Sequence, residues 1–182
     1  MIYRLDFERE CYSCINLDQD DMEDLMGDLY YPEGLPLSNV WVEMEGELYD
    51  GLGKSRQLST PDIASWEGTP VLNERAYQLL AGTLEASGEF LPIKIEKKPW
   101  FVFNTLATTN AVDLAHSEQN RRGGIYLGLK SLQFLENKME YLSLFKTDFD
   151  EKVGTFCTEA FKSQIIENAV TGVKFRTDLH RP

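Results

Sequence analysis

Apolar residues recur at helical intervals between Asp18 and Leu29. Met22, Leu25, Met26 and Leu29 lie three or four positions apart, among a run of carboxylates. This spacing predicts an amphipathic helix, and acidic residues in its first turn suit the positive end of the helix dipole. We therefore expect this segment to be helical, with the four apolar side chains facing the core.

Capping residues followed by an apolar period predict two further helices. Asn73 is a good N-cap for a helix that runs to about Ala86, with Gly88 just beyond its end. Thr158 can cap a last helix in the same way. The apolar residues of these helices are Ala76, Tyr77, Leu80 and Leu84 in the first, and Phe161, Ile165 and Ile166 in the second.

Alternating patterns predict the strands. Residues 1–8 and 41–48 alternate in this way, and the second segment places Glu43, Glu45 and Glu47 on one face. Such an arrangement is typical of a strand with one acidic, solvated face.

The strongest hairpin signal joins residues 90–95 to residues 100–104 through Glu96–Pro99. Residues 110–115 could form one or two helical turns, and Arg121–Gly124 is predicted to be a loop. Hairpins interrupted by single helices, without a regular βαβ rhythm, indicate an α+β fold with a largely antiparallel sheet. The remaining short strands are predicted at residues 125–129, 142–146, 154–157 and 172–175.

The length and composition fit one globular domain. A chain of 182 residues, 42% of them hydrophobic, can bury a sizeable core without disulfides or a metal. We expect residues 1–182 to form a single domain, in which residues 1–60 are a possible acidic N-terminal subregion. The polar, glycine-containing stretch Gly51–Thr60 is the best candidate for an internal boundary.

Negative charge is concentrated in the first third of the chain. The formal net charge is -12, and residues 1–60 contain 14 Asp and Glu against 4 Lys and Arg. Such an excess can steer a basic partner and raise its association rate. The simpler interpretation is a solvated face that maintains solubility. The net charge also argues against binding to nucleic acid or to an anionic membrane surface.

The sequence predicts a cytoplasmic protein. No apolar stretch approaches the roughly 18 residues of a membrane helix, and the first residues lack the apolar core of a signal peptide. Three cysteines cannot all pair, which fits a reducing compartment. Cys11 and Cys14 form a CxxC motif, but no paired ligands accompany them for zinc, and acidic residues follow them rather than a helix N-terminus. We expect ordinary thiols.

Other chemical motifs are incomplete. The acidic run from Asp18 has Glu23 and Leu29 where a calcium loop requires Gly and Glu. Asp113, His116 and Ser117 could share a helical face, but no nucleophile elbow is present. The chain has neither a phosphate-binding Walker loop nor a GxGxxG motif. The sequence therefore predicts no catalytic residue, no cofactor and no metal site, and it fixes no oligomeric state.

From Pro61 onward, the order of short motifs resembles a known family. Each motif alone is a strand or cap signature, and their order and spacing carry the resemblance. The chain is similar to immunity proteins of bacterial polymorphic toxin systems, long catalogued as a domain of unknown function, with myxobacterial members. The resemblance covers about residues 61–176. The motifs are Pro61–Trp66, Val71–Arg75, Phe90–Ile93, Phe101–Asn104, Val112–Leu114, Leu144–Lys146, Phe156–Lys162 and Thr171–Phe175.

The resemblance implies a protein that is encoded beside its toxin gene and blocks the cognate toxin by direct contact. The family has no agreed catalytic residues, so none are assigned here. The alternative function is an uncharacterised small-ligand-binding protein or an enzyme of unknown reaction. A deep pocket with convergent polar groups would favour the alternative, and a shallow acidic face flanked by exposed aromatic residues would favour the immunity protein.

We expect the N-terminal third to supply much of the toxin-binding surface, because it is the most acidic part and fits the family pattern least. A divergent face on a shared scaffold is what pairwise specificity requires. Carboxylates would steer the toxin and nearby aromatic residues would provide affinity. The predicted partner-binding residues are Asp20, Asp21, Asp24, Asp28, Tyr30, Tyr31, Trp41, Glu43, Glu45 and Glu47.

Overall fold

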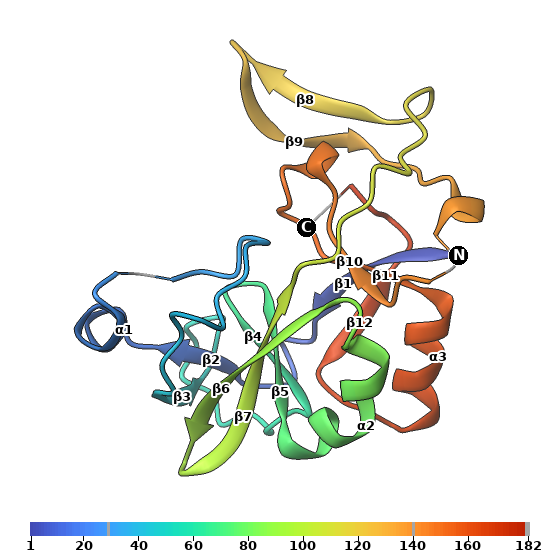
Figure 1. The fold of residues 1–182 in the computed structure, drawn as a ribbon. Coiled ribbons are helices and arrows are strands. Elements are labelled where there is room, and N and C mark those ends of the chain that lie inside the picture. Colours follow the sequence, from blue (N-terminus) through green and yellow to red (C-terminus); the bar gives the residue numbers. More distant parts are fainter. Residues whose placement is uncertain (29, 140, 181–182) are drawn as a thin grey trace.

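A computed structural model of the protein describes residues 1–28, 30–139 and 141–180. These residues form three α-helices and twelve strands (Figure 1). The strands are arranged in a four-stranded sheet, a six-stranded sheet and a separate two-stranded hairpin. Most neighbouring strands are antiparallel, and β3 and β6 are parallel. The predicted α+β class with a largely antiparallel sheet is therefore confirmed.

The four-stranded sheet has the order β10-β11-β1-β12 and the six-stranded sheet the order β2-β3-β6-β7-β5-β4. The hairpin consists of β8 and β9. The elements are β1 (Ile2–Phe7), β2 (Cys14–Leu17), α1 (Gln19–Met26), β3 (Glu45–Tyr49), β4 (Ile63–Trp66), β5 (Thr69–Asn73), α2 (Glu74–Leu84), β6 (Gly88–Ile95), β7 (Lys98–Thr105), β8 (Glu118–Arg122), β9 (Ile125–Ser131), β10 (Leu144–Phe145), β11 (Phe156–Thr158), α3 (Glu159–Glu167) and β12 (Val173–Arg176).

The predicted central hairpin is confirmed as β6 and β7, which pair along their whole length. Its turn is shorter than expected. Only Glu96 and Lys97 lie between the strands, with φ angles of 52° and 65°. Positive φ at both central residues is what a type I′ turn requires, and that turn matches the twist of the flanking strands.

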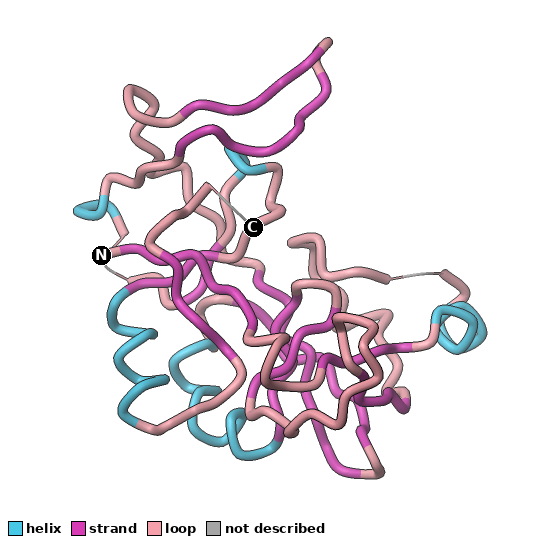
Figure 2. Tube along the Cα trace, turned by 180° about the vertical axis from the view of Figure 1, so that it is seen from behind, coloured by secondary structure: helices cyan, strands magenta, loops and turns pink. Residues whose placement is uncertain are grey.

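Helices α2 and α3 lie side by side next to the two sheets (Figures 1 and 2). Asn73 caps α2, as predicted, because its side chain accepts a hydrogen bond from the Ala76 N–H at 2.8 Å. Thr158 occupies the N-cap position of α3, but its side chain makes no capping hydrogen bond. Thr83 of α2 donates to Gln164 of α3 at 2.6 Å.

A hydrogen-bonded junction connects the two sheets. Asp62 precedes β4 of the six-stranded sheet, and Thr171 lies two residues before β12 of the four-stranded sheet. The Asp62 carboxylate accepts from the Thr171 N–H at 3.0 Å and from the Thr171 hydroxyl at 3.1 Å. It also accepts from Asn73 at 3.1 Å and from Arg75 at 2.8 Å. One carboxylate directly before β4 thus binds the end of β5, α2 and the approach to β12.

Gly172 lets the backbones meet at this junction. Its φ is +100°, and an added Cβ would lie 2.1 Å from the Ile63 carbonyl oxygen and 2.5 Å from Pro61. The Gly172 carbonyl accepts from the Glu8 N–H at 3.0 Å, just after β1. Only glycine combines this backbone conformation with so close an approach.

The acidic helix is confirmed, but its boundaries and its buried face differ from the prediction. Asp18 is the N-cap, and Gly27 ends α1 in a left-handed conformation. Met22 is buried and Met26 is half-buried, whereas Leu25 is 48% exposed, so its predicted core position is wrong. Successive helix residues are rotated by about 100°, and this short peripheral helix presents only a narrow face to the core. Leu29 lies outside the described residues.

Three other predicted segments need correction. Of residues 41–48, only those from Glu45 onward are in a strand. Residues 110–115 are not helical, because the backbone of Ala111 and Asp113 bonds to residues 133 and 135. Arg121 and Arg122 belong to β8, which leaves Gly123 and Gly124 as the turn.

The β8–β9 hairpin projects from the body (Figure 1) and contacts residues 149–151 through Gln119, Arg121 and Tyr126. The Tyr126 hydroxyl donates to the buried Asp150 carboxylate, which also accepts from the Gly154 N–H at 2.7 Å. Arg121 bonds Glu151 at 2.6 Å, and Gln119 donates to the Phe149 carbonyl at 2.7 Å. These contacts hold a hairpin that would be marginally stable alone.

The Asp62 junction gives a testable stability prediction. Burial opposes ionisation of Asp62, but hydrogen bonds from Thr171, Asn73 and Arg75 outweigh it and hold the pKa of this carboxyl below its ordinary value of 3.8. We expect Asp62→Asn to lower the free energy of unfolding by about 2 kcal/mol at pH 7, because the amide has fewer acceptor sites for these donors. Urea denaturation of wild type and variant measures the difference.

The same difference should depend on pH. Folding lowers the pKa of Asp62. Its stabilising contribution is therefore complete at pH values above the unfolded-state pKa, and it is lost as pH falls through the pKa of the folded protein. The gap between wild type and Asp62→Asn should therefore narrow in acid. Asp24→Asn, at an exposed position of α1, is the control and should change stability little. Equal unfolding free energies for all three proteins at pH 7 would contradict the role of the junction.

Candidate partner-binding surface

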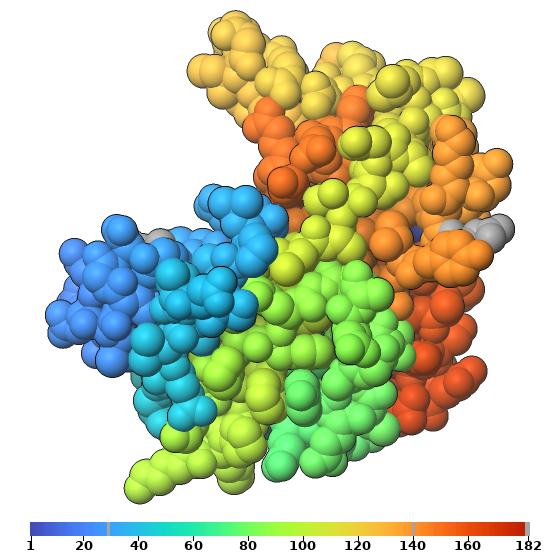
Figure 3. Space-filling view, viewed as in Figure 1, coloured from blue at the N-terminus to red at the C-terminus, as the bar shows by residue number. Residues whose placement is uncertain are grey.

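The predicted acidic residues lie on α1 and around β3, at one end of the molecule (Figure 1). Strand β2 leads into α1 and pairs with β3, with Leu17 opposite Gly46. Asp20, Asp21, Asp24 and Asp28 are exposed on or just after the helix. Figure 3 shows this N-terminal segment, in blue, protruding from one side of the molecule. The fold therefore brings both acidic segments to the same region.

The two acidic segments differ in how their charges are balanced. Around β3, Glu43 forms an ion pair with Lys94 at 2.5 Å, and Glu45 accepts from the Lys97 N–H at 3.0 Å. Glu47 accepts from the side-chain amide of Asn16 at 3.1 Å. In the part of the chain that the structure describes, no ion pair involves an aspartate of α1 or Asp28. Of the two segments, the helix therefore carries more negative charge without an ion pair, since Glu45 and Glu47 bond only to neutral groups.

The predicted aromatic residues are packed against Trp66 of β4 rather than projecting freely. Tyr31 stacks on Trp66 with ring centroids 5.5 Å apart, and Trp41 meets it edge-on at 6.2 Å. The Trp41 indole N–H donates to the Pro92 carbonyl at 2.9 Å. Tyr30, Tyr31 and Trp41 are all half-buried against the core residues of the six-stranded sheet. These side chains attach the acidic segment to the six-stranded sheet, and any role in binding remains a prediction.

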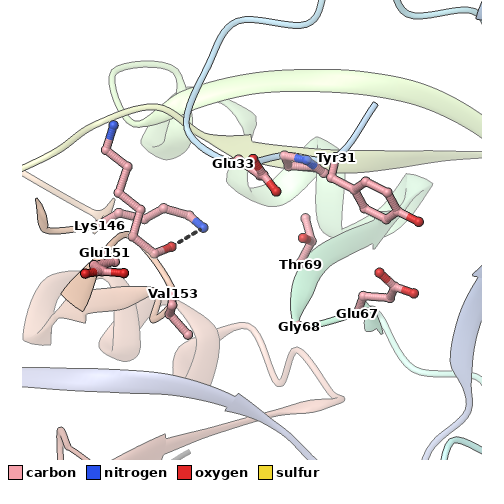
Figure 4. Close-up of a pocket in the computed structure, with 10 residues that line it drawn as sticks. Tyr31, Glu33, Glu67, Gly68, Thr69, Lys146, Glu151 and Val153 are labelled. Carbon is pink, nitrogen blue, oxygen red and sulfur yellow. Dashed lines mark hydrogen bonds between the residues drawn. The ribbon is translucent and has the colours of Figure 1, made fainter. Parts of the chain in front are cut away.

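A cleft of about 590 Å³ opens between the two sheets (Figure 4). Three segments line it: residues 31–33, the turn between β4 and β5 at residues 67–69, and parts of the segment 146–153. Figure 4 shows Lys146, Glu151 and Val153 on one side and Glu67 and Thr69 across from them. Sequence reasoning did not identify this site.

Lys146 is the most buried charged group in the cleft wall, with 9% of its surface exposed. Its ammonium donates to the Lys152 carbonyl at 2.9 Å, and no carboxylate among the described residues lies within 4.0 Å of it. Burial lowers the pKa of Lys146, and Lys152 adds to this, while the charges of Asp150 and Glu33 act in the opposite direction. The cleft therefore contains a buried cation without a close counter-ion.

The carboxylates of the cleft are of two kinds. Glu151 is paired with Arg121 of the β8–β9 hairpin. Glu33 and Glu67 are exposed, and across the described ranges their carboxylates make neither a hydrogen bond nor an ion pair. These two side chains are thus free to bind donors from outside the molecule.

The chemical motifs considered from the sequence do not assemble. His116 contacts Asp113 at 2.8 Å, but the Ser117 hydroxyl bonds the backbone of Gln133 instead of the imidazole. Cys11 is exposed and unpaired, while Cys14 is buried, and burial raises the pKa of the Cys14 thiol. Among residues 1–28, 30–139 and 141–180, no three His, Cys, Asp or Glu side chains converge as a metal site.

Within the same residues, no helix is long and apolar enough to cross a membrane.

Comparison with protein families gives a match to the Immunity protein family (Imm11) over residues 48–178. The chain belongs to this family. The match extends the range expected from the sequence motifs at both ends. A search of curated proteins found no match.

The matched range divides the candidate surfaces of the immunity protein. Residues 48–178 include the Asp62 junction and the cleft residues Glu67 and Lys146. Helix α1 and the aromatic residues Tyr31 and Trp41 precede it. The matched region therefore contains the junction and the two cleft residues Glu67 and Lys146, whereas the acidic helix lies outside it.

We expect the buried charge of Lys146 to lower the stability of the folded protein relative to an apolar side chain. Replacing a buried charge with an apolar side chain of similar length is often neutral or stabilising. We expect Lys146→Met to raise the free energy of unfolding by about 1 kcal/mol at pH 7. This gain in the free energy of unfolding should be smaller at alkaline pH. Burial lowers the pKa of Lys146 because it penalises the charged ammonium, and the penalty disappears once the lysine is deprotonated.

Chemical denaturation at pH 7 and pH 10 measures this effect. Lys54→Met, at an exposed position, is the matched control and should have little effect at either pH. A loss of more than about 1 kcal/mol in Lys146→Met would instead show that the bond to the Lys152 carbonyl stabilises the fold.

Proposed function

We propose that the chain is a cytoplasmic immunity protein that binds its cognate bacterial toxin and neutralises it by direct contact. Membership of the immunity protein family is the observation that supports this most strongly. The exposed, unpaired aspartates of α1 add a surface suited to a basic partner. We further propose that no catalytic residue, cofactor or metal takes part, so that inhibition depends on occupancy of the toxin alone.

The acidic helix would act mainly on the rate of association. Unpaired charges on one protruding element generate a local potential that guides an oppositely charged partner before contact. Nucleic acid and anionic membranes are unsuitable partners for a chain with a net charge of -12. Charge therefore favours a basic protein surface.

Tyr31 and Trp41 are the proposed affinity anchors. Large aromatic side chains that are already held in place lose little conformational entropy on binding. The contacts with Trp66 and the Pro92 carbonyl hold both rings in this way. Their half-buried state means that substitution to alanine also removes core packing, so binding by such variants must be compared at matched folded fraction.

A small-ligand-binding protein is the second candidate, because polar groups converge on the cleft around Lys146. Its walls, however, carry charged groups of both signs, with exposed carboxylates opposite a buried ammonium. This mixture suits a polypeptide, which offers donors and acceptors together, better than a small anion. We therefore treat the cleft as part of the protein-binding function.

Charge reversal on α1 tests the steering role. We expect Asp21→Lys, Asp24→Lys and Asp28→Lys combined to slow association with the toxin about tenfold at low ionic strength, with a smaller effect on dissociation. The effect should diminish at physiological salt, because screening shortens the reach of surface charges. Stopped-flow or surface-based kinetics with the toxin domain encoded by the neighbouring gene measures both rates.

The matched control reverses three exposed glutamates on α2 and α3, namely Glu74, Glu85 and Glu167. It changes the net charge equally but leaves α1 intact, so its association rate should fall much less. If reversal on α1 leaves the association rate unchanged at both salt concentrations, the helix is a solubilising face. The interface would then move to the β8–β9 hairpin at Arg121 and the segment around Asp148.

A further inference from the structure

The cleft between the sheets contains hydrogen-bonding capacity that the chain itself does not use. The Lys146 ammonium has three N–H donors, and the described residues provide one acceptor, the Lys152 carbonyl at 2.9 Å. Burying a cation without a counter-ion is costly. An acceptor brought into the cleft by a partner would reduce this cost, which makes Lys146 a group that favours occupancy.

The facing wall carries hydrogen-bond acceptors that need donors. Glu33 and Glu67 come from two different segments, and each presents a carboxylate without a partner in the described residues. Carboxylates accept hydrogen bonds only, and they bind guanidinium and ammonium groups most strongly. An incoming group must therefore supply donors here and an acceptor at Lys146.

The two segments that carry Glu33 and Glu67 are held in position before any partner arrives. The turn after β4 is fixed by the Gly68 N–H, which donates to the Ser65 hydroxyl at 3.1 Å. The Glu33 N–H donates to the Tyr31 carbonyl at 2.8 Å, and Tyr31 is stacked on Trp66. A preformed site avoids much of the ordering cost of binding.

The simplest alternative occupants fit poorly. A small anion at Lys146 would also meet the charges of Glu33, Glu67 and Glu151, and like charges in a shared site repel. For a metal ion, the described residues bring no three suitable ligands together. A polypeptide segment meets both requirements, since its backbone offers carbonyl acceptors and a basic side chain offers charged donors.

We infer that the cleft between the sheets binds a segment of the partner toxin that carries an arginine or lysine, with the cationic side chain on Glu33 and Glu67 and a main-chain carbonyl on Lys146. This inference rests on the proposed toxin-binding function. The cleft volume of about 590 Å³ is sufficient for a few residues of such a segment. The site is separate from the acidic helix, so steering and capture reside on different elements.

The first test uses the cation chemistry alone, without the toxin. N-acetyl-arginine N-methylamide is titrated into isotope-labelled protein, and its uncharged citrulline counterpart is the matched probe. We expect saturable amide shifts at Gly68, Thr69 and Lys146 with the arginine probe, and roughly fivefold weaker binding of the citrulline probe. Glu33→Gln combined with Glu67→Gln should abolish this preference, whereas Glu74→Gln with Glu85→Gln, at exposed positions away from the cleft, should preserve it.

Equal binding of the two probes in the cleft, or shifts confined to α1, would overturn the cationic assignment.

The second test measures affinity for the purified toxin domain. The double glutamine variant should lose about tenfold in affinity through faster dissociation, and Lys146→Met should also dissociate faster. Unaltered spectra away from the cleft establish that the variants are folded.

The two tests separate the inference from the function on which it rests. If the wild-type protein binds the toxin and the double variant binds it equally well, the cleft assignment is overturned and the proposed function stands. If the wild-type protein leaves the toxin unbound, the proposed function fails, and with it a toxin segment as occupant. In that case, arginine-selective shifts would still show a cation site in the cleft.

Discussion

The junction between Asp62, Thr171 and Gly172 sets the distance between the two sheets. Asp62 accepts four hydrogen bonds from three residues, and Gly172 allows a backbone approach that any Cβ would prevent. The turn containing Glu67 follows directly from β4, and the segment containing Lys146 lies beside β11. The walls of the cleft therefore belong to different sheets, and their separation depends on this junction.

This arrangement suggests how a common scaffold can serve a specific partner. The family match includes the junction, Glu67 and Lys146, while α1, Glu33 and the aromatic residues Tyr31 and Trp41 lie before it. Discrimination between related toxins requires features that repel the wrong partner as well as features that attract the right one. Charges on a protruding helix can change in number and position without disturbing the junction.

The sequence predicted the elements whose signals are local. The β6–β7 hairpin, α1 and the cap at Asn73 were found because alternation, helical spacing and capping chemistry are encoded within a few residues. Strand β4 was missed because all four of its residues are buried, which removes the alternation. The cleft was missed because Glu33, Glu67 and Lys146 are far apart in the chain, and only tertiary packing brings them together. A lysine directly after the apolar pair Leu144 and Phe145 was the one local signal.

The central claim is that the N-terminal acidic segment and the cleft together contact the toxin. Hydrogen–deuterium exchange of the chain, alone and with the toxin domain encoded by the neighbouring gene, tests it most directly. The account predicts slower exchange in the complex at residues 19–28, 31–34 and 67–69, with little change in α3. Protection confined to the β8–β9 hairpin or to α3, with these three segments unchanged, would contradict it.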